Sequence, residues 1–277
     1  MEIIGEKKNC QISNLTTLTD GPSMFQHGRK IILCGGYGQN DNRCLQFKNG
    51  KWSYFNSLKH YRQYSTIVSM KNSVYLIGGE GSPTTSEILS FNETVWKNGP
   101  TVPDRSISNA CGARISEDKL LIIGGFSDSE LGSTQILMLN TYDNTWQNED
   151  LIFLEHGRYD HACVVYNDKI IITGGSGNDA ALISTEIVEQ VGSNLTIRKG
   201  GSLRHKRTQH GMGIIYYNGV PTLIAFGGFQ DVTFAPVKTL EMWNDDSETW
   251  DIARDIKMEF PRSHAGYVTL PRELLCS

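Results

Sequence analysis

Five copies of a short apolar run, each ended by two glycines, organise the chain of 277 residues. A short run that is rich in β-branched residues and closed by Gly-Gly predicts a strand buried on both faces and followed by a sharp turn. Glycine is needed there because the turn uses backbone angles and close contacts that a Cβ forbids. The pairs are Gly35-Gly36, Gly78-Gly79, Gly124-Gly125, Gly174-Gly175 and Gly227-Gly228. Their spacing of 43, 46, 50 and 53 residues indicates a stacked or radial array of repeats.

Each repeat continues with the same succession of features. A polar turn of Asn, Asp or Gly supplies hairpin chemistry. A tryptophan follows, which is large enough to fill the space between neighbouring sheets. The tryptophans are Trp52, Trp96, Trp146 and Trp250, whereas the fourth repeat has Ile197 near this position, where we expect thinner packing. Next comes a loop that ends in an arginine, and then a strand of small residues that suits a crowded central axis. The arginines are Arg62, Arg105, Arg158, Arg207 and Arg262.

These features predict a four-stranded antiparallel sheet in every repeat. A ring of such sheets buries both faces of each sheet and leaves only short, protected edges. Full repeats start near residues 21, 64, 107, 160 and 209. The chain then shows one more inner strand and a second-strand pattern without glycines, so we expect a closing sheet from residues 263–277 together with 1–20. The whole of residues 1–277 is thus expected to form one all-β domain.

The ordered combination of Gly-Gly, an aromatic residue, Trp and Arg resembles the Kelch repeat over about residues 21–270. The resemblance implies a β-propeller, and closure by both termini implies six blades. The chain is most similar to the Kelch domains of BTB–Kelch substrate adaptors. This resemblance implies a non-enzymatic protein-interaction module, namely the substrate-recognition domain of a ubiquitin-ligase adaptor. Assembly with a ligase then requires a BTB domain ahead of this chain.

In those adaptors, arginines at the mouth of the inner strands and residues just after the double glycines face the partner peptide. Arginine forms forked contacts with carboxylates, and aromatic residues supply binding area, so we expect an acidic protein loop or peptide as the partner. The alternative is that recurring arginines pack and hydrogen-bond between sheets. Ser176 occupies the fourth post-glycine position. The candidate partner-binding residues are Tyr37, Arg62, Glu80, Arg105, Phe126, Arg158, His161, Arg207, His210, Phe229 and Arg262.

The alternative function is a propeller enzyme, metal-dependent or sugar-processing, that uses the central pocket. The stretch Glu155–Cys163 concentrates metal-type ligands, including Asp160 and His161. However, His161 matches His210 in the next repeat, which favours a structural or rim role. The glycine-rich turns lack the Lys-Ser/Thr of a phosphate loop, and the chain has no nucleophile elbow and no Cys-x-x-Cys. We therefore expect no catalytic residue, no metal and no cofactor.

Composition limits the partners further. A formal charge of −4 argues against general binding to nucleic acid or to a membrane surface. No stretch reaches the length of a membrane-spanning helix, and residues Met1–Lys8 lack the apolar core of a signal peptide. These features predict the cytoplasm, with an extracellular location as the alternative if a signal peptide has been trimmed.

Six cysteines leave the redox state open. Cys34 lies in a buried-strand pattern, and Cys111 and Cys163 stand at matching points of neighbouring repeats, where a small apolar residue suffices. We expect reduced thiols in a reducing compartment. If disulfides form, the pairs to consider are Cys34 with Cys44 and Cys10 with Cys276.

Overall fold

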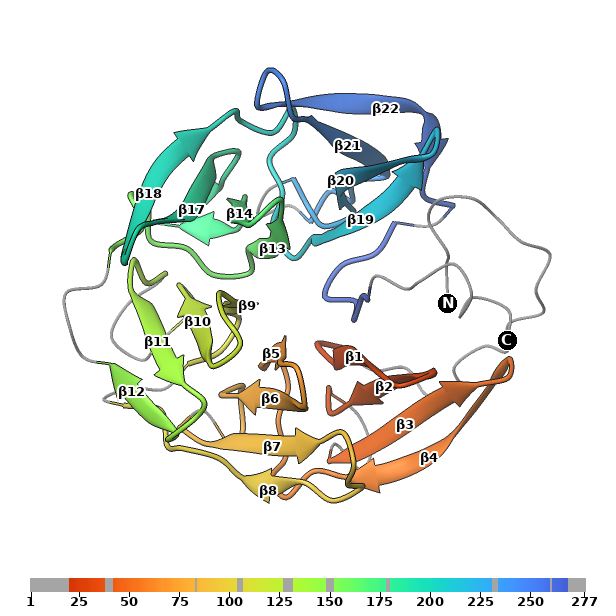
Figure 1. Ribbon diagram of the computed structural model, residues 1–277. Coiled ribbons are helices and arrows are strands. Elements are labelled where there is room, and N and C mark those ends of the chain that lie inside the picture. Colours follow the sequence, from red (N-terminus) through yellow and green to blue (C-terminus); the bar gives the residue numbers. More distant parts are fainter. Residues whose placement is uncertain are drawn as a thin grey trace.

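The computed structural model describes residues 20–37, 42–82, 84–103, 107–126, 132–147, 152–177, 180–230, 234–259 and 261–268. Within these ranges the chain forms five four-stranded antiparallel sheets and no helix. Figure 1 shows the sheets arranged around a common centre, like the blades of a propeller. The prediction of an all-β propeller is therefore confirmed.

Each blade is an antiparallel meander whose strands follow one another in sequence from the centre outwards. The first blade contains β1 (Ser23–His27), β2 (Lys30–Cys34), β3 (Arg43–Lys48) and β4 (Lys51–Ser57). The second contains β5 (Thr66–Ser69), β6 (Ser73–Ile77), β7 (Ser86–Ser90) and β8 (Lys97–Asn98). The third contains β9 (Cys111–Arg114), β10 (Lys119–Ile123), β11 (Ile136–Asn140) and β12 (Thr145–Gln147). The fourth contains β13 (Ala162–Tyr166), β14 (Lys169–Thr173), β17 (Thr185–Val191) and β18 (Asn194–Gly200). The fifth contains β19 (Gly211–Tyr217), β20 (Val220–Phe226), β21 (Thr239–Asn244) and β22 (Thr249–Lys257). A small extra pair, β15 (Ser176–Gly177) and β16 (Ala180–Ala181), lies between β14 and β17.

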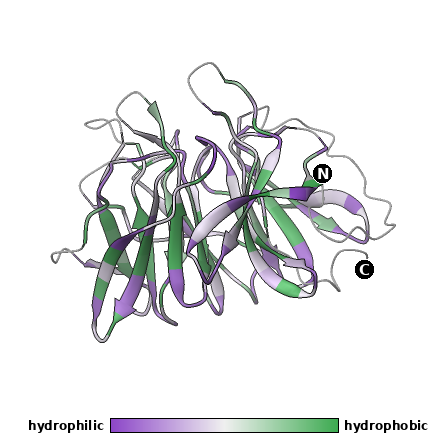
Figure 2. Ribbon diagram, turned by 90° about the horizontal axis from the view of Figure 1, so that it is seen from above, coloured by the Kyte–Doolittle hydropathy of each residue, from purple (hydrophilic) through white to green (hydrophobic). Residues whose placement is uncertain are grey.

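The second strand of each blade is the apolar run that precedes a double glycine. In β10 the four residues Leu120–Ile123 have no exposed surface. The core forms between blades rather than inside one: Leu121 of β10 packs in one cluster with Ile172 of β14. Figure 2 shows the strands as mainly hydrophobic and the turns at their ends as mainly hydrophilic. Burial of both faces removes the apolar runs from water, which is the main stabilising contribution of such a run.

Six backbone hydrogen bonds form a closed ring around the centre, at the end of the propeller that carries the double glycines. Each member donates its N–H to the carbonyl oxygen of the member before it, over 2.8 to 3.2 Å, and the first donates to the last. All six have a left-handed φ between 44° and 62°, which a non-glycine residue keeps only where the surrounding structure enforces it. Five members precede the inner strands of the five blades, and the sixth follows β22. The members are Gly21, Tyr64, Asn109, Asp160, Gln209 and His264.

The described residues form five blades rather than the six that the sequence predicted. Residues 261–268 run between the fifth and the first blade (Figure 1) and contain no strand, although an inner strand was expected there. This segment contacts both neighbours: the ring of Tyr267 lies 5.8 Å from that of Phe226, and a Cβ on Gly266 would lie 3.0 Å from that of Met24. The rest of the expected closing blade falls on residues 1–19 and 269–277, outside the described residues.

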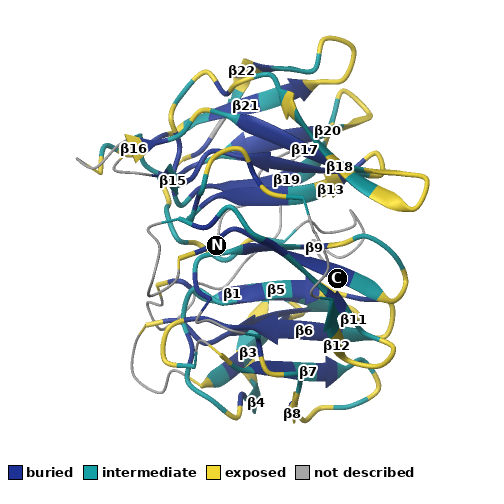
Figure 3. Cartoon of the chain, turned by 90° about the vertical axis from the view of Figure 1, so that its left-hand side faces the viewer, coloured by how far each residue is buried: buried dark blue, intermediate teal, exposed yellow. Residues whose placement is uncertain are grey.

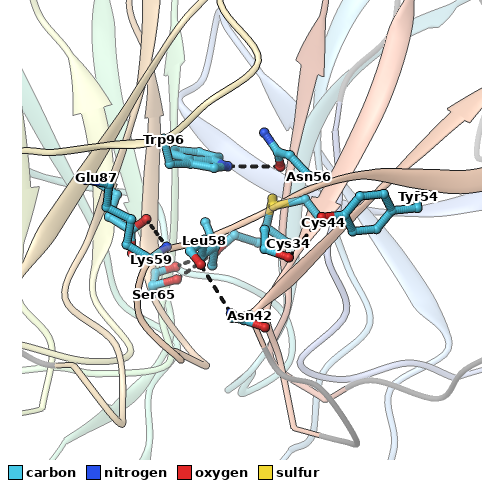
Figure 4. The surroundings of a disulfide bond; sticks show 12 residues. Cys34, Asn42, Cys44, Tyr54, Asn56, Leu58, Lys59, Ser65, Glu87 and Trp96 are labelled. Atoms are coloured by element: carbon cyan, nitrogen blue, oxygen red, sulfur yellow. Dashed lines mark hydrogen bonds between the residues drawn. A yellow bond between two sulfur atoms is a disulfide. The ribbon is translucent and has the colours of Figure 1, made fainter.

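Two of the tryptophans fill the space between blades as expected. Trp96 has no exposed surface and meets Phe25 of the preceding blade edge to face, with ring centres 6.0 Å apart. Its indole N–H donates to Asn56 Oδ1 over 3.2 Å, as Figure 4 shows. Trp250 is equally buried and donates to Thr185 Oγ1 of the preceding blade over 3.0 Å. Trp52 and Trp146 are only partly buried.

The fourth blade has an ionic network beside the position where the tryptophan is missing. Ile197 is partly buried and packs against the cluster that contains Val188. The neighbouring Arg198 donates to Glu189 over 2.8 Å and to both carboxylate oxygens of Glu248 in the fifth blade over 2.6 and 2.7 Å. These groups are about one-third exposed, so each pair contributes little by itself.

Two disulfides correct the expectation of reduced thiols for the four cysteines that the structure describes. Cys34 and Cys44 are register partners on β2 and β3, with Cα atoms 4.1 Å apart (Figure 4). Cys111 and Cys163 lie on the inner strands of adjacent blades, with Cα atoms 5.9 Å apart. Positions that match in neighbouring repeats are brought side by side by the propeller, which places these two thiols within bonding distance. Cys10 and Cys276 lie outside the described residues.

In the part of the chain that the structure describes, no helix is long and apolar enough to cross a membrane.

We expect Trp96→Ala to lower the free energy of unfolding by about 3–5 kcal/mol, because it empties a fully buried space between two blades. Urea unfolding followed by circular dichroism measures the loss. Trp52→Ala is the matched control, and its loss should be clearly smaller because that side chain is partly exposed. Equal losses in the two variants would contradict the assignment of Trp96 to the core between blades.

Candidate functional site: the loop face and its central mouth

The double glycines join each blade to the next one. The second glycine donates its N–H to a carbonyl of the following blade's entry loop, as Gly125 does to Arg158 O over 2.8 Å. A Cβ on Gly124 would come within 2.6 Å of that same oxygen, and one on Gly125 within 2.9 Å of Ser108 O. Both glycines also have positive φ, so no other residue fits this joint without displacing the backbone. The five carbonyls that accept these bonds belong to Arg62, Ile107, Arg158, Arg207 and Arg262.

The arginine side chains at this joint turn inward, towards their own blade. Arg62 donates to Gly78 O over 2.6 Å, to Thr85 Oγ1 over 2.8 Å and to Glu87 Oε1 over 2.9 Å. Glu87 in turn accepts the backbone N–H groups of Lys59 and His60 over 2.7 and 3.0 Å (Figure 4). The carboxylate therefore has a full set of donors and forms a satisfied buried ion pair.

The same arrangement recurs in two further blades. Arg158 donates to Gly174 O over 2.9 Å and pairs with Glu186. Arg207 donates to Gly227 O over 2.9 Å and to Glu241 Oε1 over 3.1 Å. Burial lowers the pKa of Arg62, Arg158 and Arg207, and the adjacent glutamate opposes that shift in each case.

The assignment of these arginines to the partner-binding surface therefore needs correction. Arg62, Arg158 and Arg207 have no exposed surface, and each charge is matched by a glutamate of the same blade. They present no atom to a partner. Their role is structural, which was the alternative in the sequence analysis, and their side chains bond within their own blade. Arg262 differs, because its side chain is exposed while its carbonyl accepts the bond from Gly228.

The third blade replaces the ion pair by an apolar pair. Ile107, which is fully buried, holds the position that matches Arg62. Register places Leu137 opposite Ile122 where the second, fourth and fifth blades have their glutamate, and Leu137 packs against the cluster that contains Ile107. Arg105, the predicted member of the arginine set, lies outside the described residues. In this blade the carbonyl that accepts the bond from the second glycine belongs to Ile107, two residues after Arg105.

His161 and His210 are also structural rather than exposed. They are only 7% and 5% exposed and stand at the start of two inner strands, directly after ring members. His210 Nε2 lies 2.9 Å from Thr173 Oγ1, and His161 Cε1 would be 2.8 Å from a Cβ on Gly124. Burial, followed by the charge of Arg158, lowers the pKa of His161 to about 3. Burial, followed by the charge of Arg207, lowers the pKa of His210 well below its usual value. Both imidazoles are thus neutral at physiological pH.

The post-glycine residues do lie at the surface, on one end of the propeller that we call the loop face. Each pairs through a backbone bridge with a residue of an entry loop. Tyr37 is 68% exposed, Phe126 is 36% exposed and Glu80 is exposed, whereas Ser176 and Phe229 are partly buried. Figure 3 shows β15 and β16 projecting from this face, opposite the hairpin of β17 and β18. Part of the predicted face is therefore available to a partner, and its composition is aromatic and acidic rather than basic.

The six ring members surround the opening of a central cavity of about 1370 Å³, and we call this opening the mouth. The Asp160 carboxylate accepts from Asn109 Nδ2 over 2.5 Å and from Gln209 Nε2 over 3.3 Å. His264 lies between two carboxylates, with Nε2 3.3 Å from Asp160 and Nδ1 3.4 Å from Asp20.

Tyr64 adds an aromatic wall to the mouth, with its ring 4.6 Å from that of His264. Its hydroxyl donates to Asp20 Oδ2 over 2.8 Å. Burial raises the pKa of Tyr64, and the bond to Asp20 raises it further. The sequence analysis identified only Asp160 among the residues of the mouth. A sequence signal exists, because each of the five non-glycine ring members stands two residues after a residue whose carbonyl accepts the bond from a second glycine.

The metal-type ligands of Glu155–Cys163 do not converge. The Glu155 carboxylate pairs with Lys199 over 2.8 Å, Asp160 belongs to the mouth, and Cys163 is in a disulfide. Among the described residues no group of three or more His, Cys, Asp and Glu is placed to hold a metal ion.

Comparison with known proteins adds to this geometry. The chain is 26% identical to Kelch repeat and BTB domain-containing protein 12 of Danio rerio over 145 residues, which are 46% of this chain and 23% of that protein. It is 30% identical to an F-box/kelch-repeat protein of Arabidopsis thaliana over 140 residues, 49% of this chain and 35% of that protein. It is 25% identical to Kelch-like protein 40 of Xenopus tropicalis over 201 residues, 67% of this chain and 31% of that protein. Its homologues are Kelch-repeat proteins.

The Kelch resemblance seen in the sequence is thereby confirmed, and the fold is the corresponding propeller. No family model matches the chain. The matched regions span about a third or less of the length of these Kelch-repeat relatives.

The third blade suggests a direct test of the buried ion pairs. We expect Arg62→Ile alone to cost about 3–5 kcal/mol of unfolding free energy, because it leaves the buried charge of Glu87 without its cation. The double variant Arg62→Ile/Glu87→Leu copies the pair Ile107/Leu137 and should lose less than either single variant. Urea unfolding of all four proteins gives the coupling energy. Losses that simply add would contradict the joint as described.

His161 should make stability depend on pH. Its folded pKa of about 3 lies below the unfolded value near 6.5. Between these values the unfolded chain binds more protons, so stability is full above pH 6.5 and falls as the pH drops towards 3. The slope contributed by one such group approaches about 1.4 kcal/mol per pH unit. The difference between wild type and His161→Leu in unfolding free energy, measured from pH 7 to pH 4, should change by that slope. Parallel curves for the two proteins would contradict a buried neutral imidazole.

Proposed function

We propose that this chain is a non-enzymatic protein-interaction propeller that binds a protein segment on its loop face. The exposed aromatic residues Tyr37 and Phe126 are the observation that carries the proposal. Large aromatic side chains at the surface supply much of the energy of protein recognition, and they stand here where short loops of several blades meet. The names of the relatives, which join Kelch repeats to BTB or F-box domains, support the same class of function.

We further propose that the propeller has six blades, the last one built from both terminal segments. The hydrogen-bond ring supports this count, because His264 occupies a sixth position with a left-handed φ and the same backbone bonds as the other five. A sixth sheet between β19 and β1 would also cover the edges that five blades leave open.

The role of substrate-recognition domain in a ubiquitin-ligase adaptor is part of the proposal, and it requires a BTB domain elsewhere in the complete protein. The cytoplasm is the proposed location, and nucleic acid and membranes are not proposed partners because the net charge is negative. An acidic partner is not part of the proposal, because three of the five arginines on which it was based, Arg62, Arg158 and Arg207, are neutralised inside the blades.

Affinity capture from a cell lysate tests the binding face. Tyr37→Ala/Phe126→Ala should reduce the recovery of captured proteins about tenfold or more, since each aromatic anchor contributes roughly 1–2 kcal/mol or more. Tyr142→Ala/Tyr216→Ala, which removes two exposed aromatic residues from hairpin ends at the opposite end of the blades, is the matched control and should leave recovery unchanged. Loss of capture in the control variant alone would place binding on the opposite face and overturn the proposal.

A further inference from the structure

The mouth and the post-glycine positions carry negative charge. Asp20 and Glu80 are exposed, and Asp160 lies deeper in the mouth. No lysine or arginine occupies a ring position or a described post-glycine position. Among the described residues between the second and third strands of the five blades, Glu80 and Lys238 are the charged ones. The described ring and post-glycine positions therefore present negative charge to an approaching partner.

Aromatic rings stand among these carboxylates. Phe126 packs against Tyr159 with ring centres 5.8 Å apart, and Phe229 packs against Phe234 at 5.2 Å. Phe234 is 62% exposed and Tyr37 is 68% exposed. Aromatic faces attract cations through their quadrupole, and carboxylates attract them through charge, so the two kinds of group favour the same ligand.

A polar group without a partner lies behind the mouth. His161 lines the central cavity and is 93% buried, and neither of its ring nitrogens has a hydrogen-bond partner. Buried polar groups are normally satisfied, and an unsatisfied one calls for an explanation. A neutral imidazole offers a lone pair, which is what an ammonium or guanidinium group needs as an acceptor.

Several cations near this end of the propeller are held by groups of the blades themselves. The backbone N–H groups of Lys59 and Arg204 bond to Glu87 and Glu241 on the third strands of their blades. Arg62, Arg158 and Arg207 are enclosed and paired. Arg262, whose side chain is exposed at its joint position, is the exception among the described joint arginines.

We infer that the segment bound on the loop face is basic, and that one of its lysine or arginine side chains enters the mouth between Asp20, Asp160 and the ring of Tyr64. This inference rests on the proposed function and adds the chemistry of the partner. Carboxylates at the rim hold the cation, the aromatic rings pack on its alkyl chain, and the imidazole of His161 accepts a hydrogen bond at the inner end.

Fluorescence anisotropy with labelled peptides tests this chemistry. A hexalysine and a hexaarginine peptide should bind the wild-type protein, and a hexaglutamate peptide should not. Asp20→Asn/Glu80→Gln should weaken binding of the basic peptides about fivefold or more, because it removes two charges at the rim. Raised salt should weaken binding as well. Binding of hexaglutamate, or no binding by either basic peptide, would overturn the inference.

Matched controls separate the mouth from the general negative charge of the protein. Asp246→Asn/Asp143→Asn removes the same number of charges from exposed hairpins of the opposite end and should leave the affinity unchanged. Equal weakening by the two double variants would show attraction to net charge alone and would overturn the inference. Tyr64→Phe keeps the ring and its packing while it frees Asp20, so it should retain binding.

A failure of the basic-partner inference can be told apart from a failure of the proposed binding face. If capture from a lysate depends on Tyr37 and Phe126 while the captured protein binds Asp20→Asn/Glu80→Gln as tightly as wild type, the binding face is correct and the basic partner is wrong. If capture is unaffected by both double variants, the loop face itself is wrong.

Discussion

The propeller depends on one hydrogen bond that recurs around it, from the N–H of a second glycine to a carbonyl in the entry loop of the next blade. This bond requires two backbones to approach more closely than any side chain permits, as the 2.6 Å between a Cβ on Gly124 and Arg158 O makes plain. The glycines are therefore fixed by the contact between blades rather than by the turn alone. Every other feature of the loop face is built on the loop position that this bond defines.

From that position the chain alternates between the core and the surface. In the second to fifth blades the joint residue turns its side chain into the blade, the next residue forms a bridge with the post-glycine residue, and the one after it enters the hydrogen-bond ring with a left-handed φ. Arg158 and Asp160 illustrate the consequence. They are two residues apart in the sequence, yet one is sealed against Glu186 and the other lines the mouth. In this blade two opposite charges that are close in the sequence are thus separated, one in the interior and one at the mouth.

The sequence predicted the repeat, the strands and the tryptophan positions because each depends on short-range pattern and residue size. It did not predict the orientation of the arginines, because their glutamate partners lie about 25 to 34 residues further along the chain and become neighbours only when the third strand pairs. The pairing of Cys111 with Cys163 escaped for the same reason. This disulfide depends on the contact between the inner strands of two adjacent blades, and a local sequence pattern does not predict that contact. The sixth blade that the sequence predicted rests on the terminal segments, which lie outside the described residues, so it stays a prediction.

The third blade shows what the ion pairs do for the fold. Ile107 and Leu137 replace arginine and glutamate together, and the joint to Gly79 is kept at 2.7 Å. The carbonyl of the joint residue, rather than its charge, is therefore what the propeller requires. A buried pair of this kind often contributes little net stability over an apolar pair of similar size. Its consequence for the surface is larger, because it encloses three positive charges that would otherwise stand beside the acidic residues Asp20, Glu80 and Asp160.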